Sequence, residues 1–358
     1  MVKTNVTTAK ISGVTAVEFD RSYPYFAVRN DGSSAVHVSA TVPECVAGTD
    51  GVVTVAAGGS YVANGGGNVL YLNGGGTVTV QGQFDKFNPF KVAAKGGGGN
   101  EVPENHNNIF RGDDLFAKGY TIDDICEMIA DGSFSDIYIG DYFTLSGTIP
   151  GVPCYVEQTG DDGAKTLVES TQTVTYNTKF RVAGLDMYLN AGDGAFSKHH
   201  AVIVPDGIIG INRMNDSNIT TGGYLNSFMF ASVLPVYNTH FSAADKFGSH
   251  LLSYRSALSN TVSGNMSSSL TWTDVKISLM SEPEACGGMI FGGKYDVGVS
   301  YKQLPLFRIA PKFVHNRNWY WLRAVANSAN FAGVGSNGNA SNAYSSITYG
   351  VRPTFVIG

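Results

Sequence analysis

The sequence lacks the long apolar segments that tie a protein to a membrane. Among its 358 residues there is no uninterrupted apolar run of about 18, the length that a membrane helix needs. Met1–Thr4 leads directly into a polar stretch, without the apolar core of a secretory signal. We therefore expect no membrane insertion and no signal-directed export.

Cysteine pairs and metal-site spacings are missing as well. The four cysteines lie far apart, and no two have the Cys-x-x-Cys spacing; they are Cys45, Cys126, Cys154 and Cys286. Four cysteines allow three disulfide pairings, and the sequence does not select one. No histidine or second cysteine stands at the spacing of a zinc site. We expect scattered free thiols, no metal and no cofactor.

Charge is scarce and forms no basic stripe. Charged residues make up 15% of the chain and the net charge is −5, which argues against binding to nucleic acid. The motifs of zinc proteases, serine hydrolases and phosphate-binding loops are absent, so we do not expect an enzyme. The 44 glycines and the many Thr, Val and Tyr residues favour a β-rich extracellular or virion protein.

Residues 1–90 read as short alternating strands separated by Gly-rich turns, and we expect a small antiparallel β-sandwich domain there. The predicted strands are Val14–Phe19, Tyr25–Arg29, Ala35–Thr41, Val52–Ala56, Ser60–Ala63, Val69–Leu72 and Thr77–Gln81. Residues 91–108 contain a run of four glycines after Lys95 and are expected to form a flexible linker.

From residue 109 the pattern mixes helices and strands. Thr121 is a natural N-cap for a helix that reaches Ala130, with two aspartates in the first turn. A second helix is predicted from Gly223 to about Val233, stopping before Pro235. A third is predicted from Ser242, with one buried face formed by Phe247, Leu251, Tyr254 and Leu258. Further strands are predicted at Asp136–Phe143, Phe180–Leu189 and Ala201–Val204.

The last forty residues have well-specified ends and a permissive middle. Seven asparagines fall within residues 316–358, against 19 in the rest of the chain. Small polar residues and aromatics between fixed apolar ends are typical of a binding surface carried by a rigid frame.

This region resembles the variable region of retroelement-diversified proteins of phages and prophages, which ends a C-type-lectin-like domain. The resemblance rests on Trp321-Leu322-Arg323, Phe331-Ala332, Asn337-Gly338-Asn339-Ala340 and Gly350-Val351-Arg352-Pro353, with upstream matches at Asp136–Tyr142, His199–Asp206 and Gln303–Phe307. It implies an α+β fold in which a C-type-lectin-like ligand-binding domain occupies residues 109–358. In that family, mutagenesis at template adenines randomises Asn-type codons.

Within the variable segment, about 319–349, we expect two groups of side chains. The expected ligand-binding positions are Tyr320, Asn327, Asn330, Gly333, Gly335, Asn339, Asn342, Tyr344 and Tyr349. The expected core positions are Trp321, Leu322, Phe331, Val334, Val351 and Phe355. Arg323 and Arg352 lie in the framework motifs and are expected to pair with carboxylates or carbonyls.

Other chemistry-bearing residues are expected to be structural. His199 and His200 precede an apolar strand, where alternation sends their side chains to opposite faces. Asp141, Asp186 and Asp206 stand alone near predicted strand ends, and nothing fixes their mutual distances. The tripeptide Arg111-Gly112-Asp113 matches the integrin motif, and we expect only a turn there.

The resemblance implies a phage fibre or spike protein of the head or tail that binds a bacterial surface protein or glycan. Residues 1–90 resemble attachment modules of phage fibre proteins, which implies docking to other virion proteins and a homotrimer. Such a protein is made in the bacterial cytoplasm and ends on the virion surface. Two alternatives stay open. One is a capsid or tail decoration protein without a specific ligand; the other is a glycan-active spike enzyme, which needs a carboxylate pair in a cleft.

Overall fold

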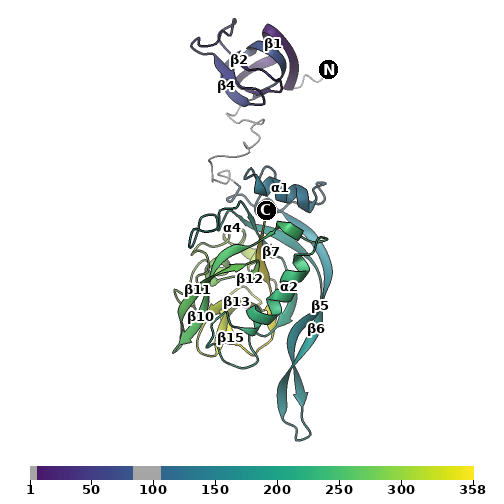
Figure 1. The fold of residues 1–358 in the computed structure, drawn as a ribbon, viewed down its shortest axis with the longest axis vertical. Helices are drawn as coiled ribbons and strands as arrows, with labels where there is room; N and C mark the ends of the chain where they lie inside the picture. Colours follow the sequence, from purple (N-terminus) through teal and green to yellow (C-terminus); the bar gives the residue numbers. More distant parts are fainter. Residues whose placement is uncertain (1–5, 84–105) are drawn as a thin grey trace. The chain divides into compact units, whose positions relative to one another are not determined.

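The computed structural model describes residues 6–83 and 106–358. The chain divides into two compact units, Met1–Gly97 and Gly98–Gly358, each with a hydrophobic core of its own (Figure 1). Most of the predicted linker lies outside the described residues, so its flexibility stays a prediction.

Unit 1 is one antiparallel sheet with the strand order β1-β4-β2-β3. The strands are β1 (Val6–Asn30), β2 (Val36–Ser39), β3 (Val53–Val55) and β4 (Ser60–Gln83). The seven predicted strands fall on these four, because the long β1 and β4 each combine several of them. Phe26 pairs with both Ala63 and Gly82, so the sheet curls and β1 contacts two parts of β4.

Unit 2 contains a six-stranded sheet in the order β12-β17-β7-β6-β5, with β9 also paired to β17. Its strands are β5 (Tyr142–Thr159), β6 (Lys165–Leu185), β7 (Ala201–Pro205), β9 (Leu251–Leu252), β12 (Ile277–Leu279) and β17 (Pro353–Ile357). Every residue of β7, β9, β12 and β17 is buried, whereas most residues of β5 and of the first half of β6 are exposed or partly exposed.

A five-stranded sheet runs in the order β15-β14-β13-β16-β8, and a two-stranded ribbon accompanies it. The five strands are β8 (Gly210–Asn212), β13 (Tyr320–Val325), β14 (Asn330–Val334), β15 (Ala340–Tyr344) and β16 (Tyr349–Val351). The ribbon consists of β10 (Tyr254–Ser263) and β11 (Met266–Val275).

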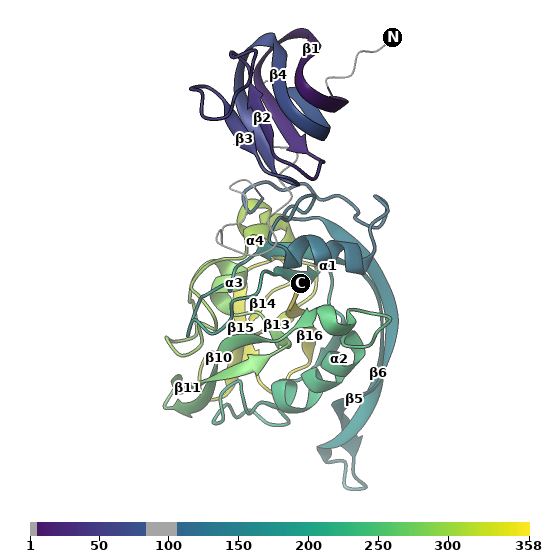
Figure 2. The ribbon, with the colours of Figure 1, turned by 45° about the horizontal axis from the view of Figure 1, so that its top comes forward.

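The helices of unit 2 are short and lie beside the sheets. They are α1 (Ile122–Ala130), η1, a π-helical turn (Met229–Val233), α2 (Leu234–Phe241), the 3-10 turn η2 (Gly248–His250), α3 (Glu282–Cys286), α4 (Pro305–Ile309) and the 3-10 turn η3 (Pro311–Phe313). Figure 2 shows α2 beside the β5–β6 ribbon, where Phe241 of α2 packs on Tyr176 of β6 with ring centroids 5.6 Å apart.

The predicted α+β fold class is wrong. Strands make up 47% of the described residues and helices 12%, spread over several sheets, so the protein is closer to all-β. The helical content was overestimated because apolar spacings in short segments suit a helix and a buried strand equally well.

The first predicted helix is confirmed as α1. The Thr121 hydroxyl accepts from the Asp124 backbone N–H, and the Asp124 carboxylate accepts from the Thr121 N–H, which completes a capping box. Ile125 and Ile129 are fully buried on one face. This helix was predictable because its start signal is entirely local.

The second predicted helix has the wrong bounds. Regular helix begins only at Met229, and it continues past Pro235 to Phe241 as η1 and α2. Pro235 lies in the first turn of α2, where a missing backbone N–H removes no bond of that helix. The proline therefore marks the start of an α-helical segment rather than its end.

The third predicted helix does not exist. Ser242 is the C-cap of α2, and the chain then passes through η2 into β9 and β10. Phe247, Leu251, Tyr254 and Leu258 are all buried, as expected, but they reach the core from turns and strands. Their spacing predicted burial correctly and secondary structure incorrectly.

The β5–β6 ribbon is the largest feature missing from the predictions. The predicted strand at Asp136–Phe143 overlaps β5 only at its last two residues, and the one at Phe180–Leu189 covers only the end of β6. Strand β7 matches its prediction at Ala201–Val204. In Figures 1 and 2 the ribbon runs past the other strands of unit 2. Across residues 6–83 and 106–358, no helix is long and apolar enough to cross a membrane.

Candidate functional site

The predicted variable segment forms most of the five-stranded sheet. Strands β13, β14 and β15 are antiparallel neighbours, and β16 lies parallel to β13. The residues between the strands, 326–329, 335–339 and 345–348, form the connections. The segment is therefore a sheet whose strands are joined by short connections, and β13 is covered on both faces, since all six of its residues are buried.

The six predicted core residues of the segment are confirmed. Trp321, Leu322, Phe331, Val334, Val351 and Phe355 are each fully buried. The Trp321 indole Nε1–H donates to the backbone oxygen of Asn212 at 3.0 Å, so the largest side chain of the core is also satisfied in its polar group.

Both framework arginines are structural, as predicted. Arg323 is 2% exposed, and its guanidinium donates to Ser256 Oγ at 2.8 Å and lies 3.5 Å from Glu284 Oε2. Arg352 is 1% exposed and donates to three backbone oxygens, those of Pro205, Phe313 and Val314, at 2.9–3.0 Å. These bonds tie the sheet to neighbouring segments and hold its strands in place.

The nine predicted ligand-binding residues divide into three groups by exposure. Asn339 and Tyr344 are exposed. Four are partly exposed: Asn327, Asn330, Asn342 and Tyr349. Three are buried: Tyr320, Gly333 and Gly335. The structure therefore leaves six of the nine within reach of a ligand, and their binding role stays a prediction.

Tyr320 faces the interior rather than solvent. Its side chain is fully buried, its hydroxyl donates to the Val314 oxygen at 2.6 Å, and burial raises its pKa to about 12. At Gly333 an added Cβ would lie 2.9 Å from the backbone oxygen of Tyr320, so no side chain fits. Gly335 is buried in the turn, where its N–H donates to the Asn339 oxygen at 2.8 Å. Placing these three residues at the surface was wrong.

Several asparagine side chains shape the sheet instead of facing a ligand. Asn330 Nδ2 donates to Asn342 Oδ1 at 2.7 Å across β14 and β15. The Asn327 side-chain oxygen Oδ1 accepts from the backbone N–H groups of Ala329 and Asn330, which fixes the turn after β13. The asparagines of the next turn, Asn337 and Asn339, are exposed. Asn337 Oδ1 accepts from the Asn339 N–H at 3.4 Å and Asn339 Nδ2 donates to the Ala340 oxygen at 3.3 Å, so each amide keeps hydrogen-bonding capacity that these single contacts do not use.

The loop around Asn218 lies against the turn at residues 345–348, although the two are more than a hundred residues apart in the sequence. This contact was not predicted from the sequence. The Asn218 side-chain oxygen accepts from the Ser346 N–H and hydroxyl, and the Ser345 hydroxyl donates to the Ser217 oxygen at 2.7 Å. Ile219 of this loop is 53% exposed, and the adjoining turn carries exposed Tyr344 and Ile347. The run of asparagines at 212, 215 and 218 is the signal that would have found this loop.

Three aromatic rings lead from the core to the surface. Trp321 is fully buried, its ring centroid lies 4.7 Å from that of Tyr349, and Tyr349 lies 5.3 Å from Trp319. Trp319 is 40% exposed at the end of this series. Rigid aromatic area at a surface position is a common component of binding sites.

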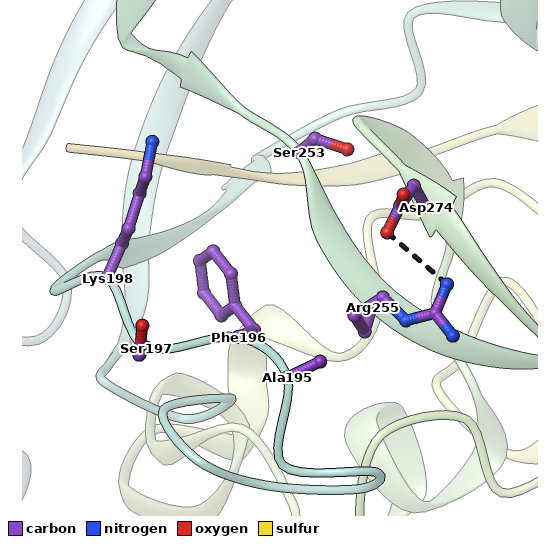
Figure 3. A pocket seen from close by; sticks show the side chains of 7 residues that line it. All are labelled: Ala195, Phe196, Ser197, Lys198, Ser253, Arg255 and Asp274. Atoms are coloured by element: carbon purple, nitrogen blue, oxygen red, sulfur yellow. Dashed lines mark hydrogen bonds and ion pairs between the residues drawn. The ribbon is translucent and has the colours of Figure 1, made fainter.

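A separate hollow of about 500 Å³ lies outside the variable segment. It is lined by Ala195, Phe196, Ser197, Lys198, Ser253, Arg255 and Asp274 (Figure 3). Arg255 is paired with Asp193 at 2.9 Å and with Asp274 at 3.4 Å, so its charge is largely offset.

The aspartates at 141, 186 and 206, which stand alone in the sequence, are held by hydrogen bonds and ion pairs within the fold. Asp141 is fully buried and accepts from Arg111 and from the backbone N–H groups of Gly112, Asp113 and Tyr138. Carboxylates held in this way orient local backbone and leave few acceptor sites for a substrate. The Arg-Gly-Asp tripeptide is part of this network, because the Arg111 guanidinium also binds Asp136.

Asp186 and Asp206 belong to two other networks. Asp186 contacts both adjacent histidines: it lies 2.7 Å from His199 Nδ1, and its other oxygen accepts from the His200 N–H at 2.9 Å. Asp206 is bonded to the Arg181 guanidinium. No group of three potential metal ligands occurs in the described part of the chain, and the four cysteines are unpaired thiols.

No protein-family model matches this sequence, and no curated protein matches it. One solved structure to which the chain is similar is the stem and receptor-binding domain of the spike protein P1 from bacteriophage PM2. The match has 16% sequence identity, covers 50% of this chain and 68% of that chain, and has a TM-score of 0.13. A TM-score this low supports no conclusion about fold or function.

Proposed function

We propose that this protein is a bacteriophage virion protein that binds a receptor on the bacterial surface. The observation that carries the proposal is the contrast within one short segment. Buried Arg323 and Arg352 fix the strands, while Asn339 and Tyr344 stand exposed at their ends. A rigid frame with exposed amide and aromatic groups suits equilibrium recognition, because little conformational freedom is lost on binding.

The proposed contact residues form a set that we call the C-terminal surface. They are Ile219, Trp319, Asn337, Asn339, Tyr344 and Ile347, all of which are exposed. Four apolar or aromatic side chains supply contact area and two asparagine amides supply hydrogen bonding. The turn that carries Asn337 and Asn339 lies at one end of β14 and β15, and Tyr344 lies at the other end. None of the contact residues carries a charge, so we expect recognition of a surface protein or glycan to be only weakly sensitive to salt.

We further propose that this surface is diversified by a retroelement, in line with the motifs around Trp321 and Arg352. The proposal does not need the lectin-like fold, only a sheet whose strands are fixed. Sequencing codons 316–358 across a phage population tests it. Substitutions at adenines should gather at codons for Asn337, Asn339 and Tyr344, and spare the buried residues.

Variation at codons 316–358 no higher than over codons 109–300 would rule out diversification. The codons of buried Tyr320 and Gly333 should vary less than those of the exposed residues. Equal variation in both groups would show that surface exposure does not determine which codons vary. If the protein also failed to bind cells, the decoration protein without a ligand would become the better account.

We propose binding without bond making. Asp141 and Asp206, which a glycan-active enzyme would use, are engaged by Arg111 and Arg181 respectively. Release of sugar from bacterial surface glycan by the wild-type protein, lost in Asp206→Asn, would contradict this. An unchanged glycan would support it.

We propose that unit 1 docks the protein to other virion proteins on the particle surface and holds three copies together. In such a trimer, the edge strands of the unit 1 sheet would be covered by neighbouring copies. This cover would prevent them from pairing with strands of unrelated proteins. Immunogold labelling of purified virions tests the location. Chemical cross-linking of the purified protein tests the threefold assembly, with a ladder that ends at three copies expected and a ladder that ends at any other number counting against it.

A further inference from the structure

The second interaction surface that the structure offers is the free edge of β6. In the six-stranded sheet β6 pairs with β7 only from Phe180 onward, and the Lys179 oxygen still accepts from Asp206 N, so residues 165–178 have β5 on one side and no paired strand among the described residues on the other. A side-chain contact is made there by Gln172, which donates to the Ile211 oxygen at 2.9 Å. Figures 1 and 2 show this part of the ribbon extending away from the remaining strands. We call residues 167–177 the outer edge of β6.

The backbone groups of the outer edge can be assigned a direction. The Lys179 oxygen accepts from Asp206 N at 2.8 Å on the β7 side, whereas Val182 N donates to the Asp141 oxygen on the β5 side. Because successive residues of an antiparallel ladder alternate in direction, the odd-numbered residues from 167 to 177 turn their N–H and C=O groups outward. Within the described residues, no backbone hydrogen bond reaches these groups from that side.

The two edges of the ribbon differ in their protection. Strand β5 carries Pro150 and Pro153 and an irregularity between Ile149 and Val152, features that interrupt pairing at its free edge. Residues 165–177 contain neither proline nor glycine and are rich in Thr and Val. No charged residue occurs between Glu169 and Lys179. Only the β6 edge is therefore open to another strand.

The ribbon also exposes apolar area that the rest of the unit leaves uncovered. Val156 and Val168 pair directly across the two strands and are 40% and 37% exposed. A two-stranded ribbon alone is marginally stable in water, whereas a third and fourth strand would supply both hydrogen bonds and cover.

We propose that the outer edge of β6 pairs antiparallel with the same edge of a second copy of this chain. The charge pattern suits this occupant. In the twofold registers centred on residue 170 or 171, Glu169 faces Thr171 or Thr173 of the other copy, and Lys165 faces Thr175 or Asn177. Like charges therefore do not face each other at these positions, and the result is a continuous four-stranded ribbon.

The proposal goes beyond receptor binding, since it uses a different part of unit 2. It is also compatible with a threefold assembly through unit 1, because three twofold contacts would join two such trimers. Pairing of the β6 edge with a strand of another protein is the competing possibility, and it predicts no association of this chain with itself.

Thr173→Pro tests the proposal. Thr173 is one of the outward residues, so proline there removes an N–H that β5 does not use, and edge strands tolerate proline. The full-length protein and the variant are compared by multi-angle light scattering over a concentration series. We expect the mass of the wild-type protein at high concentration to be twice that of the variant.

Thr173→Ala is the matched control, because it removes the same side chain and keeps the N–H. It should retain the wild-type mass. Tryptophan fluorescence during unfolding shows whether each variant is folded. If Thr173→Pro does not fold, Thr175→Pro, which changes another outward residue, replaces it in the comparison. Equal masses for the wild-type protein and a folded proline variant would overturn the proposal, as would equal loss of association in Thr173→Ala.

Discussion

Arg352 and Tyr320 donate hydrogen bonds to the same backbone oxygen, that of Val314. The Arg352 bond is 3.0 Å and the Tyr320 bond 2.6 Å, and the guanidinium carbon lies 5.1 Å from the centre of the tyrosine ring. The start of β13 and the residue that joins β16 to β17 are thereby anchored at one point. Tyr320 therefore contributes to the frame, and receptor contact is left to residues beyond it.

Tyr320→Phe should destabilise unit 2 by about 1 kcal/mol, because one buried hydrogen bond is lost while the ring remains. Denaturant unfolding followed by tryptophan fluorescence measures this. All three tryptophans, at 272, 319 and 321, belong to unit 2, so the signal reports that unit alone. The same variant should bind cells as the wild-type protein does. A loss of cell binding without a loss of stability would show that Tyr320 contacts the receptor.

Gly298→Ala should destabilise unit 2 by about 3–5 kcal/mol. Gly298 has a φ of +82°, and a Cβ there would overlap the guanidinium of Arg323. Moving that buried cation away from Glu284 would leave charge unpaired in the interior. Gly288→Ala is the matched control, since an added Cβ meets nothing within 4 Å and its φ is not positive. Similar unfolding midpoints for both variants would contradict this assignment.

His200 should make unit 2 less stable as the pH falls from about 6.5 to about 4. Its ring accepts from the Tyr188 N–H at Nε2 and contacts the Lys198 oxygen through Nδ1, so the neutral form fits the site. Burial lowers its pKa to about 4 from 6.5. The unfolded chain therefore binds the proton first. Stability is fully present above pH 6.5, and about 3 kcal/mol is lost by pH 4.

His200→Gln provides the comparison for this pH dependence, because an amide can donate and accept but does not titrate in this range. The difference in unfolding free energy between the two proteins should shrink as the pH falls through this window. Parallel pH profiles for wild type and His200→Gln would show that the histidine is not the titrating group.

Local signals predicted the elements that depend on local chemistry. The capping residues Thr121 and Asp124 define α1 by themselves, and the short alternating runs in residues 6–83 all became strand. Tertiary context decided the rest. The buried side chains from Phe247 to Leu258 satisfy a helical period, yet pairing of Leu251 with Ile357 draws that segment into a sheet.

The β5–β6 ribbon was missed for a related reason. Its outer half carries Thr and Val in both strands, at Val156, Thr159, Thr166 and Val168, on either side of the turn Gly160–Gly163, which is a hairpin signal. It lacks the apolar stripe that normally identifies a half-buried strand, because residues such as Thr166 and Ser170 are exposed. A strand with little to bury gives a weak sequence pattern.

The sequence predicted where in the chain the candidate site lies, but it did not predict correctly which of its side chains are exposed. Composition located the segment, and the framework arginines and core residues were assigned correctly. The register places Tyr320 and Tyr344 on the same face of the sheet, and they differ in exposure because Tyr320 lies in the central strand β13 whereas Tyr344 ends the edge strand β15. The contribution of the loop around Asn218 depends on contacts across more than a hundred residues, which a single sequence does not reveal.

The most direct test of the account measures binding of the labelled full-length protein to a panel of bacterial strains. The double variant Asn339→Ala, Tyr344→Ala is compared with Tyr301→Ala, whose side chain is 63% exposed elsewhere in unit 2. The account predicts that the double variant loses about tenfold or more in affinity, as expected for contact residues, while Tyr301→Ala binds as the wild-type protein does. Equal affinities for all three proteins, or binding of the wild-type protein to no strain, would contradict it.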